Sequence, residues 1–157
     1  MRYSEDVHTP QPLVFSLIAL VTVGTGGLGI WLLVGEDQLV GAAVILAGGL
    51  TAAFLSVLLV LRIHADGDTL RARFGPWGLS IAAEQIEGAS VARYPWTSYG
   101  GWGLRWGRHE GRSARALSVP LMRTGVFVDT TEGKRHYLNS RRPEELAEAV
   151  NRLAGRR

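Results

Sequence analysis

Two long apolar stretches decide the architecture of this chain: PLVFSLIALVTVGTGGLGIWLLV at Pro12–Val34 and LVGAAVILAGGLTAAFLSVLLVL at Leu39–Leu61. Each stretch has 23 residues and contains no Asp, Glu, Lys or Arg. A helix rises about 1.5 Å per residue, so each stretch is long enough to cross a hydrocarbon core of roughly 30 Å. Because only Gly35–Gln38 join the two stretches, we predict a transmembrane α-helical hairpin over residues 12–61.

The charges beside the apolar stretches predict the orientation of this hairpin. Its loop has no Lys or Arg, whereas Arg62, Arg71 and Arg73 follow the second stretch closely. Cytoplasmic loops of membrane proteins carry an excess of Lys and Arg. We therefore expect a multi-pass protein with both termini in the cytoplasm, and with residues 1–11 as a cytoplasmic N-terminal tail. Residues 1–11 do not form the basic segment that begins a signal peptide, so we expect the first helix to be retained.

Small residues are frequent inside both apolar stretches. The segment Gly24–Gly29 reads GTGGLG, but the pattern G-x-G-x-x-G indicates a dinucleotide site only between a strand and a helix. Inside a membrane, small residues let helices approach one another closely. We predict that nine small residues pack the hairpin, or pack hairpins of neighbouring subunits: Gly24, Gly26, Gly27, Gly29, Ala43, Ala47, Gly48, Gly49 and Ala52.

The polar remainder, residues 62–157, has a basic charge balance. It holds 16 basic and 10 acidic residues, a net charge of +6, and such an excess is attracted to anionic headgroups. The chain has no cysteine, which excludes disulfides, thiolate catalysis and Cys-based metal sites.

Short segments of alternating hydrophobicity after the apolar stretches predict an antiparallel sheet. Asp66-Gly67 lies between two such segments, which is typical of a β-hairpin turn. We predict about seven short strands, drawn from the segments 61–65, 69–74, 79–81, 89–93, 102–106, 116–120, 126–130 and 134–138. The remainder is therefore expected to be one α+β domain over residues 62–157.

The last predicted element is an amphipathic helix that begins near Pro143. Proline suits the first turn of a helix, where its missing N–H is not needed. Leu146, Val150 and Leu153 follow at the spacing of one helical face, and together they form an apolar stripe. We expect this helix to cap the sheet.

Several of these motifs occur in a recognisable order. They are Asp66-Gly67-x-x-Leu70-Arg71, Ile81-x-x-x-x-Ile86, GGWGLR at 100–105, a Gly-Val strand and SRRPEEL at 140–146. In this order they resemble bacterial membrane proteins with a pleckstrin-homology-like (PH-like) domain, particularly small actinobacterial ones with two helices before the domain. The resemblance implies a strongly bent antiparallel sheet or barrel closed by the C-terminal helix, frequent oligomerisation and a bacterial cytoplasmic membrane. It implies no activity.

Residue patterns typical of catalysis or metal binding are missing from the sequence. The histidines, His8, His64, His109 and His136, do not have the spacing of metal ligands. The chain also lacks a nucleophile elbow and a Walker-type lysine loop. We therefore predict a protein that is not an enzyme and that has no metal or cofactor.

Aromatic residues and arginines are concentrated between residues 94 and 115. If 102–106 is a strand, Trp102, Leu104 and Trp106 share one face. A small domain needs large side chains in its core, which favours burial of these rings. In the second interpretation the segment is an exposed surface for headgroups or a partner. The candidate interaction surface then comprises Tyr99, Trp102, Arg105, Trp106, Arg108, Arg112 and Arg115.

These observations favour a non-enzymatic, membrane-anchored interaction or scaffold protein. Its cytoplasmic PH-like domain is expected to bind a protein partner, a second copy of itself or anionic lipid headgroups. Nucleic acid is not expected as a partner because no RNA-binding motif accompanies the arginines. The alternative is a small oligomeric pore or transport accessory built from the Gly-rich hairpins. The apolar stretches contain no ionisable group, which argues against an ion pathway.

Overall fold

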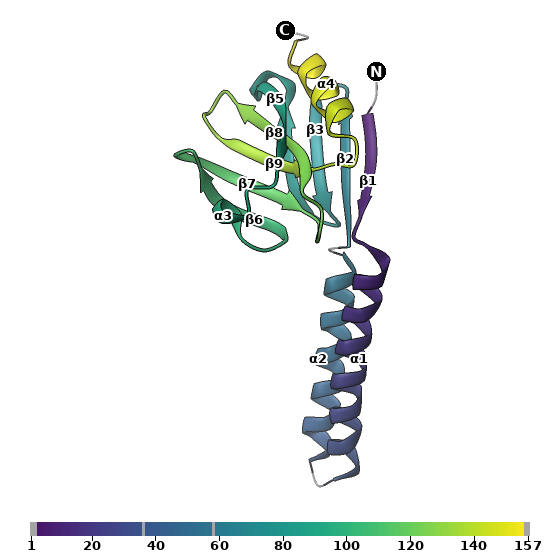
Figure 1. Ribbon diagram of the computed structural model, residues 1–157. Helices are drawn as coiled ribbons and strands as arrows, with labels where there is room; N and C mark the ends of the chain where they lie inside the picture. Colours follow the sequence, from purple (N-terminus) through teal and green to yellow (C-terminus); the bar gives the residue numbers. More distant parts are fainter. Residues whose placement is uncertain (1–2, 36, 58, 156–157) are drawn as a thin grey trace. The chain divides into compact units, whose positions relative to one another are not determined.

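The computed structural model describes residues 3–35, 37–57 and 59–155 of the 157-residue chain. It divides into two compact units (Figure 1). One unit comprises residues 9–59, and the other combines residues 1–8 with residues 60–157. The chain therefore leaves the larger unit after its first segment and returns to it after the helices.

The smaller unit is a hairpin of two helices, α1 (Gln11–Val34) and α2 (Gln38–Val57). Both helices are long and apolar enough to cross a membrane, with a mean hydropathy of 2.1. This confirms the two predicted apolar helices. The second helix is shorter than predicted because Val60 already belongs to a strand of the other unit.

Three glycines allow the close approach of α1 and α2. A Cβ atom at Gly48 would lie 2.1 Å from Thr25 Oγ1, and one at Gly41 would lie 2.7 Å from the Gly29 carbonyl oxygen. Gly29 and Gly48 were predicted as packing residues, whereas Gly41 was not. Four other predicted glycines would have no atom within 4 Å of an added Cβ: Gly24, Gly26, Gly27 and Gly49. Of the predicted alanines, Ala43 and Ala47 are exposed and Ala52 is half-buried.

The larger unit contains two β-sheets, of which the first has four antiparallel strands in the order β1-β2-β3-β4. The strands are β1 (Tyr3–His8), β2 (Val60–Asp66), β3 (Thr69–Phe74) and β4 (Trp77–Ala82). The predicted hairpin between β2 and β3 is present, but its turn is Gly67-Asp68, one residue later than predicted, because Asp66 still pairs with Thr69. Gly67 has a φ of +60°. A glycine adopts this conformation without steric cost.

Strand β1 changes the predicted domain boundary. Residues 1–11 were expected to be a tail, but Tyr3–His8 pairs with β2, and Glu5 lies opposite Ile63. Tyr3, Glu5 and Val7 face inward, while the residues between them are exposed. The acidic residue at the central inward position interrupts the apolar alternation that identifies a strand in a sequence.

The second sheet has five strands in the order β5-β8-β9-β7-β6. They are β5 (Ile86–Arg93), β6 (Gly103–His109), β7 (Arg112–Ser118), β8 (Thr124–Thr130) and β9 (Arg135–Asn139). Strands β7 and β9 are parallel. The described residues thus form nine strands instead of about seven, and the sheets are not wholly antiparallel. The strand that no predicted segment covers is β1. The parallel pair arises because residues 94–123 leave the sheet after β5, form the β6–β7 hairpin and attach it beside β9.

The predicted C-terminal helix is α4 (Pro143–Ala154), which packs against β5 and β8. Its apolar stripe is buried, as Leu146 and Val150 are completely inaccessible to solvent. Asn151 extends the contact, because its side chain exchanges two hydrogen bonds of 2.7 and 2.9 Å with the backbone of Ala89. The α+β class of this unit is therefore confirmed.

Candidate functional site

The predicted interaction residues occupy both faces of the β6–β7 hairpin. The pairing register places Trp106, Arg108 and Arg115 on one face. Arg105 and Arg112 lie on the opposite face. All five side chains are exposed, so the arginines surround the hairpin and do not form one continuous patch.

Tyr99 does not belong to this exposed set. It lies in the short helix α3 (Trp96–Tyr99) and is only 7% exposed. Its ring stacks on Tyr94, with 6.0 Å between the ring centroids, and it joins a buried cluster with Phe127 and Tyr137. Burial raises the pKa of Tyr99 to about 12.

Trp102 and Trp106 lie outside the core. Trp102 is 41% exposed and Trp106 is 65% exposed, contrary to the interpretation that the small size of the domain favoured. Trp102 precedes β6, in a bend where Gly101 and Gly103 have φ values of +30° and +88°. Strand alternation therefore does not apply to Trp102. The ring of Trp102 instead lies 5.6 Å from that of Trp96, edge to face.

One row of side chains crosses the second sheet and includes Trp106 and Arg115. Trp106 is paired with Arg115, Arg115 with His136, and His136 with Val128. The next row, two residues along each strand, is wholly apolar: Leu104, Leu117, Leu138 and Val126. The row with Arg115 and His136 therefore forms the boundary between the apolar core and the polar surface of this sheet.

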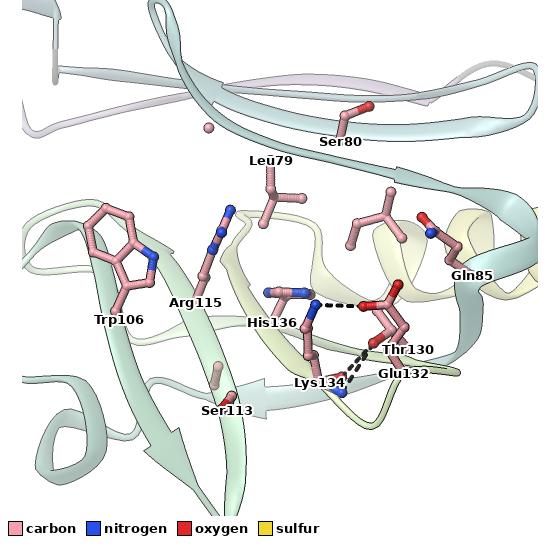
Figure 2. A pocket seen from close by; sticks show the side chains of 13 residues that line it. Leu79, Ser80, Gln85, Trp106, Ser113, Arg115, Thr130, Glu132, Lys134 and His136 are labelled. Carbon is pink, nitrogen blue, oxygen red and sulfur yellow. Dashed lines mark hydrogen bonds and ion pairs between the residues drawn. The ribbon is translucent and has the colours of Figure 1, made fainter.

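This row forms one wall of a cleft, and the edge strand β4 forms the other (Figure 2). The cleft has a volume of about 420 Å³. In Figure 2, Arg115 and His136 project from β7 and β9 toward Leu79 of β4, and Trp106 lies at one end. Gln85 and Glu132 lie toward the other end.

The cleft carries positive charge that is only partly balanced. Lys134 Nζ lies 2.5 Å from Glu132 Oε2, which neutralises that ammonium group. The Arg115 guanidinium carbon lies 6.0 Å from the centroid of the Trp106 ring. Within the described residues, neither a hydrogen bond nor an ion pair joins Arg115 to a carboxylate. A ligand in the cleft would therefore meet one free guanidinium group.

His136 is the buried titratable group of the cleft. It is 7% exposed, and its Nδ1 atom has no hydrogen-bond partner among the described residues. Burial, followed by the charges of Arg115 and Lys134, lowers the pKa of His136 to about 4. The imidazole is therefore neutral at pH 7. A buried polar atom without a partner is unfavourable by about 1–3 kcal/mol, so the unpartnered Nδ1 is an unusual feature of this wall of the cleft.

The face of the second sheet opposite Trp106 and Arg115 carries a hydroxyl–imidazole pair that the sequence did not predict. Ser98 Oγ lies 3.0 Å from His109 Nδ1. Catalysis by such a pair needs a third group that orients the imidazole. Glu110 is too far from Nε2, at 3.9 Å, and it forms an ion pair with Arg135. Since the His109 ring also stacks on Phe127, we interpret the pair as a structural contact.

Sequence reasoning found part of this site and missed the rest. It selected Trp106 and Arg115, but it did not connect them with His136 or β4. Their proximity depends on the parallel pairing of β7 with β9, which no local pattern indicates. Across the described ranges, no group of three or more His, Cys, Asp or Glu side chains is arranged to hold a metal ion.

Comparison of the chain with models of protein families, with curated proteins and with solved structures gives no match. The function is therefore inferred from the geometry and charge of the site.

Proposed function

We propose that this chain is a non-enzymatic, membrane-anchored interaction protein of a bacterial cytoplasmic membrane. In this proposal α1 and α2 cross the bilayer, and both termini and a PH-like domain lie in the cytoplasm. The exposed residues of the β6–β7 hairpin then bind anionic headgroups or an acidic surface of a partner protein. The length and hydropathy of the two helices support the anchoring role.

The exposure of Trp106 beside arginines is the observation that carries the binding role. Trp106 is 65% exposed, and it shares its face of the hairpin with Arg108 and Arg115. Tryptophan and arginine are enriched in protein interfaces and at membrane surfaces. Each arginine near an anionic membrane surface contributes about 1 kcal/mol. This face of the hairpin therefore combines apolar contact area with charge.

The outward glycines of the helical hairpin support self-association as a second part of the proposal. Gly24, Gly26 and Gly27 of α1 have open space where a Cβ would lie. Backbone surfaces of this kind allow a helix from another copy to approach closely. A homo-oligomer would present several copies of the β6–β7 hairpin together.

Vesicle tethering tests the binding role. The full chain, reconstituted in neutral phosphatidylcholine vesicles, is expected to tether added vesicles that contain phosphatidylglycerol. Raising the salt from 0.15 to 1 M shortens the screening length from about 8 to 3 Å and should abolish tethering. Arg108→Glu should reduce tethering several-fold. The matched control is Arg71→Glu, an exposed strand arginine of the first sheet, which should leave tethering nearly unchanged.

Two results would contradict this proposal. Tethering that ignores salt and lipid charge excludes an electrostatic mechanism. Equal losses in Arg108→Glu and Arg71→Glu exclude a specific role for the β6–β7 hairpin.

A further inference from the structure

The cleft between β4 and β7 combines three features of an anion-binding site. Arg115 supplies a guanidinium group beside the ring of Trp106, and no carboxylate of the described residues pairs with it. His136 supplies a buried imidazole whose Nδ1 atom lacks a hydrogen-bond partner among the described residues. Ser113 supplies a hydroxyl group that also lines the cleft. These groups come from two strands that the parallel pairing of β7 and β9 brings together.

The negative charge within the cleft does not oppose this assignment. Glu132 is the carboxylate among the lining residues, and Lys134 already binds it at 2.5 Å. The pair is therefore close to neutral, and Arg115 determines the net charge that a ligand meets. Arginine binds phosphate through two parallel N–H donors, a geometry that fixes orientation as well as charge.

We propose that this cleft binds a phosphate group, with Arg115 as the charged contact and with Ser113 and His136 as hydrogen-bonding neighbours. A phosphate has three strong acceptor oxygens and suits several converging donors better than a single cation. The cleft volume of about 420 Å³ leaves room for the molecule that carries the phosphate. That molecule is either a soluble phosphorylated compound or a lipid headgroup.

Phosphate binding has a predicted consequence for the protonation of His136. The groups that act on its charge are Arg115 and Lys134, which disfavour the imidazolium, and Asp129 and Glu132, which favour it. A bound phosphate adds negative charge and raises the pKa of the imidazole. Phosphate is therefore expected to bind more tightly as the pH falls toward 4, the pKa of His136 without phosphate.

The inference deepens the proposed function and rests on it. It names a ligand for the face of the β6–β7 hairpin that carries Trp106, Arg108 and Arg115. The two remain separable by experiment. Vesicle tethering depends on Arg108 and on anionic vesicles, whereas phosphate binding is measured in a neutral bilayer and depends on Arg115.

The test follows the imidazole NMR signal of His136 in the full chain, held in neutral phosphatidylcholine nanodiscs. The signal is assigned by its loss in His136→Gln. Inorganic phosphate replaces chloride at constant ionic strength. We expect a saturable shift of the His136 signal, with no shift for His8 or His64. Arg115→Gln should weaken binding at least tenfold. The matched control Arg93→Gln, an exposed arginine at the end of β5, should bind within twofold of the original chain.

Further arms separate the sources of phosphate and guard against misfolding. Glycerol 3-phosphate represents a soluble ligand, and nanodiscs with phosphatidate represent a lipid headgroup. A His136 shift caused by phosphatidate alone identifies the lipid source. Arg115→Lys keeps the charge but loses the two-pronged geometry, so it should bind several-fold more weakly, and it decides the test if Arg115→Gln does not fold. The assignment is wrong if the His136 signal does not shift with phosphate, or shifts without saturation. It is also wrong if Arg115→Lys and Arg115→Gln both bind phosphate with full affinity.

Discussion

Glu5 accepts hydrogen bonds from the Ser140 hydroxyl at 2.6 Å and from the Arg141 backbone N–H at 2.8 Å. Glu5 belongs to β1, before the helical hairpin, whereas Ser140 and Arg141 precede α4 near the end of the chain. The Tyr3 hydroxyl donates a third hydrogen bond to Glu5, also of 2.6 Å. Since Glu5 is only 7% exposed, these bonds replace the water that a carboxylate otherwise requires. The helical hairpin is thus an insertion between two strands of the folded domain.

We predict that Glu5→Ala destabilises the domain by about 2–4 kcal/mol. The variant leaves the Tyr3 and Ser140 hydroxyls without their carboxylate partner, and hydrogen bonds to charged groups contribute about 1.5–3 kcal/mol each. Urea unfolding of the full chain in detergent, followed by tryptophan fluorescence, measures the change. Asp6→Ala is the matched control, because Asp6 is exposed on the same strand. Equal stability of both variants would show that the Glu5 network is not needed for folding.

Exposed and buried aromatic residues should respond differently to truncation. Trp106→Ala is expected to change the free energy of unfolding by less than about 1 kcal/mol, because its ring is 65% exposed. Tyr137→Ala should cost about 3–5 kcal/mol, since its ring is completely buried. Thermal unfolding followed by circular dichroism distinguishes the two classes. A loss in Trp106→Ala as large as that in Tyr137→Ala would place Trp106 in the core after all.

The domain should lose stability in mild acid because of His136. Its pKa is about 6.5 in the unfolded chain and about 4 in the folded chain. The unfolded state therefore binds the proton first as the pH falls, and stability decreases between about pH 6.5 and 4. From pH 7.5 to 5 the loss amounts to about 2 kcal/mol.

Urea midpoints at the two pH values measure this loss, and His136→Gln provides the comparison. The variant should lose about 2 kcal/mol less than the original chain over the same interval. An identical pH dependence in both proteins would assign the acid sensitivity to other groups.

Local patterns in the sequence predicted the elements more reliably than their arrangement. Apolar runs, the Asp66-Gly67 pair and the stripe of Leu146, Val150 and Leu153 identified helices and strands, because these signals depend on neighbouring residues. Strand β1 was not predicted because Glu5 occupies an inward position. Two of its hydrogen-bond partners, Ser140 and Arg141, lie more than 130 residues away in the sequence. The cleft was not predicted because it depends on the pairing of β7 with β9, which is a long-range contact.

The two adjacent glycines of α2 offer a matched test of helix packing. Gly48 is buried against α1, and an added Cβ would lie 2.1 Å from Thr25 Oγ1. Gly49 has no atom within 4 Å of the corresponding position. We therefore expect Gly48→Ala to force the helices apart and to lower the stability of the hairpin by about 1–3 kcal/mol.

Gly49→Ala should leave the hairpin unchanged, or stabilise it slightly, because alanine favours a helix by up to about 1 kcal/mol over glycine. Unfolding of the full chain in mixed micelles with increasing sodium dodecyl sulfate measures both variants. The same samples, cross-linked before unfolding, report the oligomeric state. If Gly49→Ala lowers the oligomer population while the hairpin stays folded, Gly49 packs against a neighbouring subunit. If Gly48→Ala is as stable as Gly49→Ala, α1 and α2 do not need the close contact at Thr25.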